Sequence, residues 1–170
     1  MKKSLFLILI GITLNADAGF CSPIEKAIEH KNAADDFLRQ DKISLAVEEY
    51  QKAASLNPAS TDTYFNLAIA CHSAKNFKAA AAALRKVVSL DPKDAEAWYN
   101  LACLLLYEGD LEEAKNDFEK TRGVCAAHSA FGPLAEKGLR FIEEIKQEDP
   151  GIRKIILRLT RDLPTLQVSD

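Results

Sequence analysis

Residues 61–94 read TDTYFNLAIACHSAKNFKAAAAALRKVVSLDPKD, and residues 95–128 read AEAWYNLACLLLYEGDLEEAKNDFEKTRGVCAAH. Placed one above the other without a gap, the two blocks match at small, aromatic and large apolar positions, and residues 27–60 fit the same register of 34 residues. A fixed period of this length indicates an array of similar structural units. The matched sets are Ala34, Ala68 and Ala102; Ala46, Ala80 and Ala114; Asn32, Asn66 and Asn100; and Tyr50, Leu84 and Phe118.

The spacing of apolar residues inside each block predicts two helices. Tyr64, Leu67, Ala68 and Cys71 recur at helical spacing, which gives a first helix one buried stripe. The second half of the block carries a similar stripe and ends before Pro92, because proline cannot continue a helix. Small side chains within the stripes allow the paired helices to approach closely. We therefore expect an all-α fold.

The composition agrees with a helical chain. The 170 residues include 25 Ala but only 7 Gly and 6 Pro, so the best helix former is common and helix breakers are few. Hydrophobic residues make up 48% of the chain, which is enough for a core and excludes the disordered class. The formal net charge of −3 offers no basic excess that would favour binding to nucleic acid.

The N-terminus has the layout of a secretory signal. Lysines at positions 2 and 3 are followed by an apolar run over residues 5–14 and by small residues at positions 16 and 18. We expect a signal peptide over residues 1–18, cleaved between Ala18 and Gly19, and then a short lead over residues 19–26. An uncleaved anchor is disfavoured because a membrane span needs about twenty apolar residues.

Four cysteines follow the predicted cleavage site: Cys21, Cys71, Cys103 and Cys125. In an oxidising compartment an even number permits disulfides, but no spacing determines which cysteines would pair. The chain contains no Cys-x-x-Cys motif, and the pattern shows no Gly-rich phosphate loop or Ser/His/Asp set. A thiol or metal enzyme that uses these cysteines with His72 is therefore disfavoured. We expect no enzyme activity, no cofactor and no metal site.

The repeated positions resemble the tetratricopeptide repeat family. Its pattern has an aromatic residue, a Leu-small pair, a large apolar residue, two alanines and a final proline at set offsets. The resemblance covers 102 of the 170 residues, and the pattern fails mainly at its edges, where His30, Thr121 and Ala126 replace family residues. It implies a right-handed superhelical array of three helix-turn-helix repeats, at residues 27–60, 61–94 and 95–128.

A repeat array needs a cap, because its last helix would otherwise expose an apolar stripe. Residues 129–163 are expected to supply capping helices, the first from Pro133 to Lys146. Pro150-Gly151 breaks this run, and residues 152–163 carry a second apolar stripe among basic residues, followed by a tail over 164–170. We expect the second stripe to pack on the array; contact with anionic lipid or a partner is the alternative.

In the family resembled here, the first helices of successive repeats line a concave groove that holds an extended peptide or a partner helix. The resemblance therefore implies a protein or peptide partner. For Cys103 and Leu106 the alternative is packing against the closing helix. The implied groove residues are Lys31, Asp35, Arg39, Asp62, Phe65, Asn66, Ile69, His72, Glu96, Tyr99, Asn100, Cys103 and Leu106.

One variant of the family binds the C-terminal carboxylates of chaperones through basic and asparagine residues. Lys31 and Asn66 match that clamp, but Asp35 replaces an asparagine, and Glu96 and Asn100 replace basic residues. Two acidic residues at such a site repel a carboxylate, which excludes this class of partner. The two asparagines retain the ability to hydrogen-bond a peptide backbone.

The expected function is that of an exported, non-enzymatic binding module in the bacterial periplasm. Such a module would serve as a scaffold or client-holding subunit of an envelope complex. The alternative is a cytoplasmic secretion chaperone, because chaperones of type III translocator proteins resemble this chain in length, in their three repeats and in their closing helix. Cleavage of the predicted signal distinguishes the two hypotheses.

Overall fold

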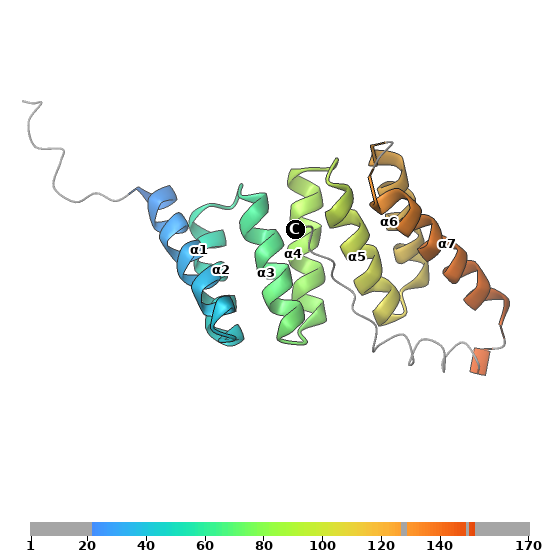
Figure 1. Ribbon diagram of the computed structural model, residues 1–170, viewed down its shortest axis with the longest axis horizontal. Helices are drawn as coiled ribbons and strands as arrows, with labels where there is room; N and C mark the ends of the chain where they lie inside the picture. The colour runs from blue at the N-terminus through green and yellow to red at the C-terminus, as the bar shows by residue number, and fades with distance from the viewer. Residues whose placement is uncertain (1–21, 127–128, 149, 152–170) are drawn as a thin grey trace, which may run out of the picture.

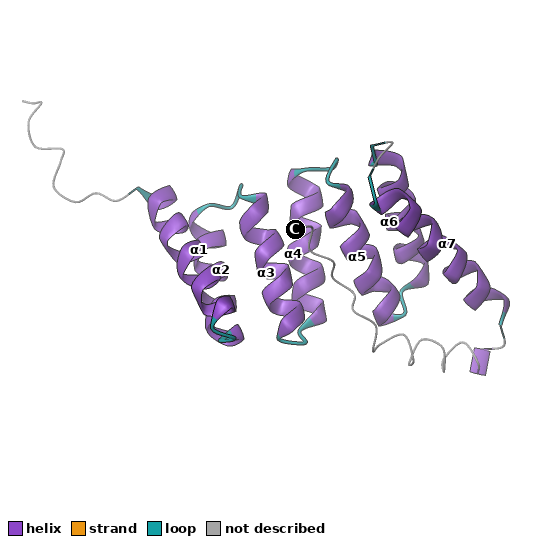
Figure 2. Cartoon of the chain, viewed as in Figure 1, coloured by secondary structure: helices purple, strands orange, loops and turns teal. Residues whose placement is uncertain are grey.

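A computed structural model describes residues 22–126, 129–148 and 150–151 of the chain. The described residues form helices joined by short loops and contain no strand, which confirms the predicted all-α fold (Figure 2). The signal over 1–18, the basic stripe over 152–163 and the tail over 164–170 lie outside them. The helices are α1 (Pro23–Arg39), α2 (Ile43–Leu56), α3 (Thr61–Ser73), α4 (Phe77–Leu90), α5 (Ala95–Glu108), α6 (Leu111–Val124) and α7 (Phe131–Gln147).

The first six helices pack as three hairpins, α1 with α2, α3 with α4, and α5 with α6. Neighbouring hairpins meet through α2 and α3 and through α4 and α5, so the helices follow one another along an elongated array (Figure 1). The hairpins reproduce the 34-residue register of the sequence. Alanines at the two matched offsets have no exposed surface, and the large residues at a third offset are 1% exposed. These residues are Ala34, Ala68, Ala102, Ala46, Ala80 and Ala114, with Tyr50, Leu84 and Phe118.

The helix ends follow from local sequence. Ser22 and Glu25 form a capping box at the start of α1, four residues before the expected start of the first repeat. Gly109 ends α5 in the left-handed conformation, with a φ of 94°, which glycine adopts without steric cost. Asp110 and Glu113 have the spacing of a capping box but do not form one: Asp110 makes no side-chain cap, and the Glu113 carboxylate accepts a hydrogen bond from Arg85.

The closing helix α7 covers the end of the array, as predicted for the first capping helix. It buries Ala135, Ile142 and Ile145. Gly138 lies so close to α6 that a Cβ atom there would be 2.6–2.8 Å from the ring of Phe118. Two ion pairs also join α6 to α7: Lys115 Nζ is 2.9 Å from Glu143, and Lys146 Nζ is 2.8 Å from Glu112. Among the described residues, no helix is both long and apolar enough to cross a bilayer.

Candidate functional site

A hollow of about 340 Å³ lies on the face shared by α1, α3 and α5, which we call the groove. The hollow is at the N-terminal ends of α3 and α5. Six of the residues implied by the family resemblance line it: Lys31, Asp62, Phe65, Asn66, Ile69 and Glu96. The remaining lining residues are Thr61 of α3, Val87 of α4 and Asp94 immediately before α5.

The sequence of α3 explains why its side chains reach this hollow. Ser60 caps the helix by accepting a hydrogen bond from the backbone N–H of Thr63 at 3.2 Å, which sets where α3 begins. Leu67 is buried on the side of the helix that forms the core. Phe65 and Ile69 are four residues apart and therefore lie on one face of the helix, where both remain partly exposed.

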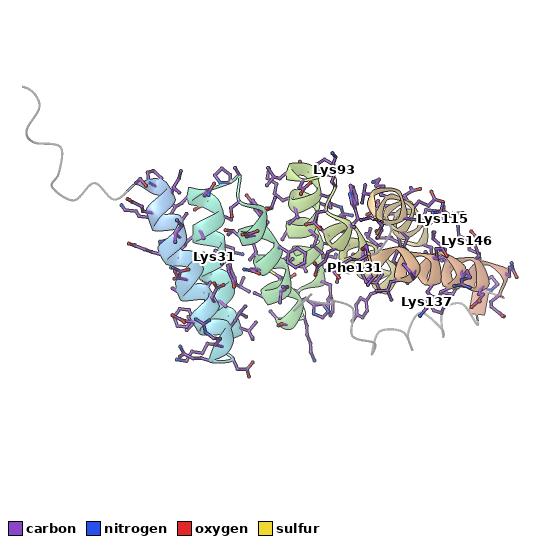
Figure 3. All side chains as sticks on the ribbon, turned by 45° about the horizontal axis from the view of Figure 1, so that its top comes forward. Lys31, Lys93, Lys115, Phe131, Lys137 and Lys146 are labelled. Atoms are coloured by element: carbon purple, nitrogen blue, oxygen red, sulfur yellow. The ribbon has the colours of Figure 1, made fainter. Side chains whose placement is uncertain are left out.

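The charge of Lys31, the basic residue that lines the hollow, is balanced by a carboxylate on the same helix. Lys31 Nζ lies 3.0 Å from the carboxylate of Asp35, one helical turn away, and Figure 3 labels Lys31 on α1. The Tyr50 hydroxyl of α2 donates a second hydrogen bond to Asp35. Burial and this neighbouring carboxylate raise the pKa of Tyr50 well above its usual value, so the hydroxyl keeps its proton. Asp35 therefore pairs with Lys31 on its own helix and also links α1 to α2 through Tyr50.

Two further groove residues lie towards the opposite ends of their helices and do not line the hollow. Arg39 is in the last turn of α1, largely exposed, and forms an ion pair with Asp36. His72 is in the last turn of α3, with its ring centroid 5.4 Å from that of Phe77. Desolvation lowers the pKa of His72, so its imidazole is neutral at pH 7.

The closing helix contacts one groove residue of the third repeat, Tyr99. The ring centroid of Tyr99 lies 5.8 Å from that of Phe118 and 5.6 Å from that of Phe131 in α7. Figure 3 shows Phe131 where α7 meets α5. Asn100 is only 1% exposed. Burial raises the pKa of Cys103 to about 11, although a hydrogen bond with Tyr99 partly opposes this shift. Of these three residues Asn100 is buried, whereas Tyr99 and Cys103 remain partly exposed.

Sequence reasoning missed two features of this surface. Asp94 lines the hollow, and its only signal was its place immediately before a predicted helix. A second hollow, of about 410 Å³, surrounds Trp98, with Lys120 Nζ 4.0 Å from the indole ring centroid. Its charged residues balance, because two are basic and two acidic. They are Arg85, Lys120, Glu113 and Asp117.

The described residues offer little for catalysis. No group of three or more His, Cys, Asp or Glu side chains lies close enough together within them to hold a metal ion. Cys71, Cys103 and Cys125 are free thiols in this part of the chain. Burial raises the pKa of Cys71 as well as that of Cys103, which lowers the reactivity of both.

Family models described as the tetratricopeptide repeat match residues 31–95 and residues 83–116. Together they run from residue 31 to residue 116, just over half of the chain. The chain belongs to the tetratricopeptide repeat family. A comparison of this repeat protein with curated protein sequences gave no match.

Solved structures of other repeat proteins share the fold. The first repeat domain of Spaghetti (RPAP3), bound to the HSP90 peptide SRMEEVD, is 23% identical, with a TM-score of 0.64 over 76% of this chain and 100% of that chain. The Yersinia enterocolitica type III secretion chaperone SycD, in complex with a peptide of the translocator YopD, is 17% identical, with a TM-score of 0.65 over 78% and 100%. PcrH, in complex with the chaperone-binding region of PopD, is 18% identical, with a TM-score of 0.63 over 71% and 92%.

Proposed function

We propose that this tetratricopeptide repeat protein is a non-enzymatic binding module that holds a peptide or a helix of a partner protein in the groove of α1, α3 and α5. The observation that carries the proposal is the hollow in that groove. Phe65 and Ile69 remain partly exposed there, together with Asn66, whose amide can both donate to and accept from a peptide backbone. Exposed apolar side chains beside a few polar groups are typical of recognition sites.

The complexes formed by proteins of the same fold support this proposal. RPAP3, SycD and PcrH have each been solved with a peptide or a binding region of another protein. Because the sequences differ strongly, the ligands of those proteins are not carried over to this chain. What supports the proposal is the combination of that fold with a hollow on the face shared by α1, α3 and α5.

We also propose that the protein works outside the cytoplasm, as a scaffold or client-holding subunit in a bacterial envelope. The basis is the sequence of residues 1–18, in which two lysines, an apolar run and small residues precede Gly19. Sequencing the N-terminus of the protein purified from its own cells tests this part. A start at Gly19 supports export, and an intact Met1 contradicts it.

A cytoplasmic secretion chaperone is the second candidate. The similarity to SycD covers 78% of this chain. The three repeats of 34 residues occupy a smaller share of it, so the similarity extends into the closing helix. An intact N-terminus, together with binding of a secreted client before its export, would favour this candidate. Both candidates use the groove, so the test of the groove does not depend on which is correct.

The groove is tested by photocrosslinking in the native cells. A benzophenone amino acid replaces Ile69 in one protein and Leu90 in another. Leu90 is a matched control because it is a large apolar residue, 38% exposed, at the end of α4 and absent from the lining of the hollow. We expect a discrete adduct from position 69 and none from position 90. Equal adducts from both positions, or none from position 69, contradict the proposal.

A further inference from the structure

The apolar stripe of residues 152–163 has no place in the function proposed above. Its large apolar residues recur at intervals of three and four, which predicts a helix with one apolar side. They are Ile152, Ile155, Ile156, Leu159 and Leu163. At about 100° per residue, Lys154, Arg158 and Arg161 fall on the opposite side of that helix. A helix with this asymmetry needs an apolar surface to cover its stripe.

The groove has an apolar surface that the described residues leave partly uncovered. Tyr99, Cys103 and Leu106 are separated by four and three positions, so they lie on one side of α5. All three pack against the core and remain partly exposed. Ile69 of α3, at the same repeat offset as Cys103, is also partly exposed. The apolar surface of α5 therefore continues onto α3, towards the hollow that Ile69 lines.

The described chain ends close to this surface. Lys146, in the last turn of α7, pairs with Glu112 at the start of α6, at a distance of 2.8 Å between Nζ and Oε1. Only two residues separate the start of α6 from the end of α5, so this ion pair lies near the C-terminal end of α5. Residue 152 follows Lys146 by six positions, and six extended residues span at most roughly 20 Å. The chain can therefore bring the stripe to Leu106, in the last turn of α5.

The length of the segment suits the width of the surface. Twelve helical residues span roughly 18 Å, because each residue adds about 1.5 Å along the axis. The axes of packed helices lie roughly 8–10 Å apart. A helix that begins beside the end of α5 and crosses it therefore reaches α3, the next helix of the groove, at its far end.

We propose that residues 152–163 lie as a helix across the groove, with the apolar stripe on Leu106 and Cys103 of α5 and its far end beside Ile69 of α3. The basic residues on the opposite side then stay in water, where their charges cost nothing in desolvation. A partner that packs on Ile69 in the hollow has to compete with the end of this segment. That competition rests on the proposed function, whereas the docking of the segment does not.

Photocrosslinking within the purified full chain tests the position of the segment. A benzophenone amino acid replaces Leu159 in one protein and Arg161 in another, because residues two apart on a helix point about 200° away from each other. Trypsin releases α3 within residues 53–75 and α5 within residues 94–115, and mass spectrometry distinguishes these peptides. We expect position 159 to crosslink mainly to residues 94–115 of the same molecule, and position 161 to give at least about fivefold less of that product.

Three results of the crosslinking would overturn the proposal. The first is an equal yield from the two positions, and the second is no adduct to either peptide. The third is an adduct found only in a crosslinked dimer, because the segment of a second copy would then occupy the groove.

The native thiols give an independent readout. Truncation after Gly151 removes the segment, and truncation after Leu163 removes only the tail. We expect N-ethylmaleimide to label Cys103 at least about threefold faster in the first variant and at an unchanged rate in the second, because only the first uncovers the thiol. An unchanged rate in the first variant overturns the proposal. Cys71, 2% exposed in the core, reports on folding, and if it also becomes reactive the crosslinks decide.

The groove test in native cells separates this inference from the proposed function. Removal of residues 152–170 should increase the partner adduct of position 69 at least about twofold, because a larger fraction of the chain is open to the partner. Equal adducts with and without the segment overturn the competition. If position 69 gives no adduct in either chain while position 159 crosslinks to α5, the segment docks and the proposed function fails. If position 69 gives its adduct while position 159 gives none, the binding function stands and the docking is wrong.

Discussion

The second and third repeats place equivalent residues in different environments. Phe65, Asn66 and Ile69 line the hollow, whereas at the positions 34 residues later Tyr99 contacts Phe131 of α7 and Asn100 is 1% exposed. The backbone offsets are the same, so the repeat itself does not determine which positions are available to a partner. What differs is the neighbour, because α7 packs on α5 and nothing comparable covers α3 among the described residues.

This contrast shows that a helix closing an array has two effects. It buries the apolar stripe that the last hairpin would otherwise expose, and it covers part of the groove face of the last repeat. Phe131 of α7 does this directly by contacting Tyr99. The binding surface that we propose is therefore concentrated at the first two repeats and the start of α5.

The largest effect is expected when the contact between α7 and α6 is broken. Gly138→Val places methyl groups where even a Cβ atom would be 2.6–2.8 Å from the buried ring of Phe118. We expect unfolding free energy to fall by about 3 kcal/mol, the upper part of the range for overpacking. Urea denaturation measures the change. The control is Gly123→Ala, where nothing lies within 4 Å of the added atom and no loss is expected; equal effects contradict the account.

The two asparagines give the next largest difference. Asn100→Ala removes a side chain that is 1% exposed and leaves a cavity in the packed interior, which should cost about 2 kcal/mol. Asn66→Ala, at the same offset in the open repeat, should change stability by less than about 0.5 kcal/mol. Denaturation of the two variants side by side tests this. Similar losses of unfolding free energy in the two variants would mean that Asn66 and Asn100 are equally buried, which would contradict the account.

The aromatic contact between α7 and α5 gives a smaller effect. Phe131 is only partly buried, so Phe131→Ala should cost about 1.5 kcal/mol, less than truncation of a fully buried phenylalanine. The same change should increase labelling of Cys103 by a thiol reagent, because the ring over Tyr99 is lost. Ile69→Ala should leave that labelling unchanged. A Phe131→Ala protein with unaltered Cys103 labelling would show that α7 does not shield the third repeat.

The smallest effect depends on alkaline pH. Burial raises the pKa of Cys103 to about 11, above the ordinary thiol value of 9.0, so the folded state holds this proton more strongly than the unfolded state does. The corresponding stability is present below about pH 9 and is lost as the pH rises towards 11. Between pH 9 and pH 11 the free energy of unfolding should therefore fall less in Cys103→Ala than in the unaltered chain. Urea denaturation at a series of pH values measures both. Parallel pH profiles would contradict the assigned burial.

The sequence predicted the hairpins well because their signals are local and repeated. The matched alanines and large residues identified the core, and the start of the first predicted capping helix at Pro133 lies two residues from that of α7 at Phe131. Helix caps were less predictable, since Glu113 pairs with Arg85 on another helix, 28 residues away in the chain, in place of its own helix end.

The site was predictable only in part, because offsets identify a face but not what covers it. The register assigned Lys31, Phe65, Asn66 and Ile69 to one surface, and all four line the hollow. It treated Asn100 like Asn66, although Asn100 is 1% exposed and Asn66 is partly exposed. Asp94 was missed because it lies between helices, where a helical period carries no information, and only the fold brings it to the hollow.

The most direct measurement compares two thiols at one offset in the same protein. Ile69→Cys adds a thiol in the open repeat, 34 residues before the native Cys103 in the covered repeat. Labelling with N-ethylmaleimide at pH 8, followed site by site with mass spectrometry, gives both rates under identical conditions. The account predicts that position 69 reacts at least about tenfold faster, because desolvation raises the pKa of Cys103 to about 11 and keeps its thiolate scarce. Equal rates, or faster labelling of Cys103, would contradict the claim that the second repeat is open and the third is closed.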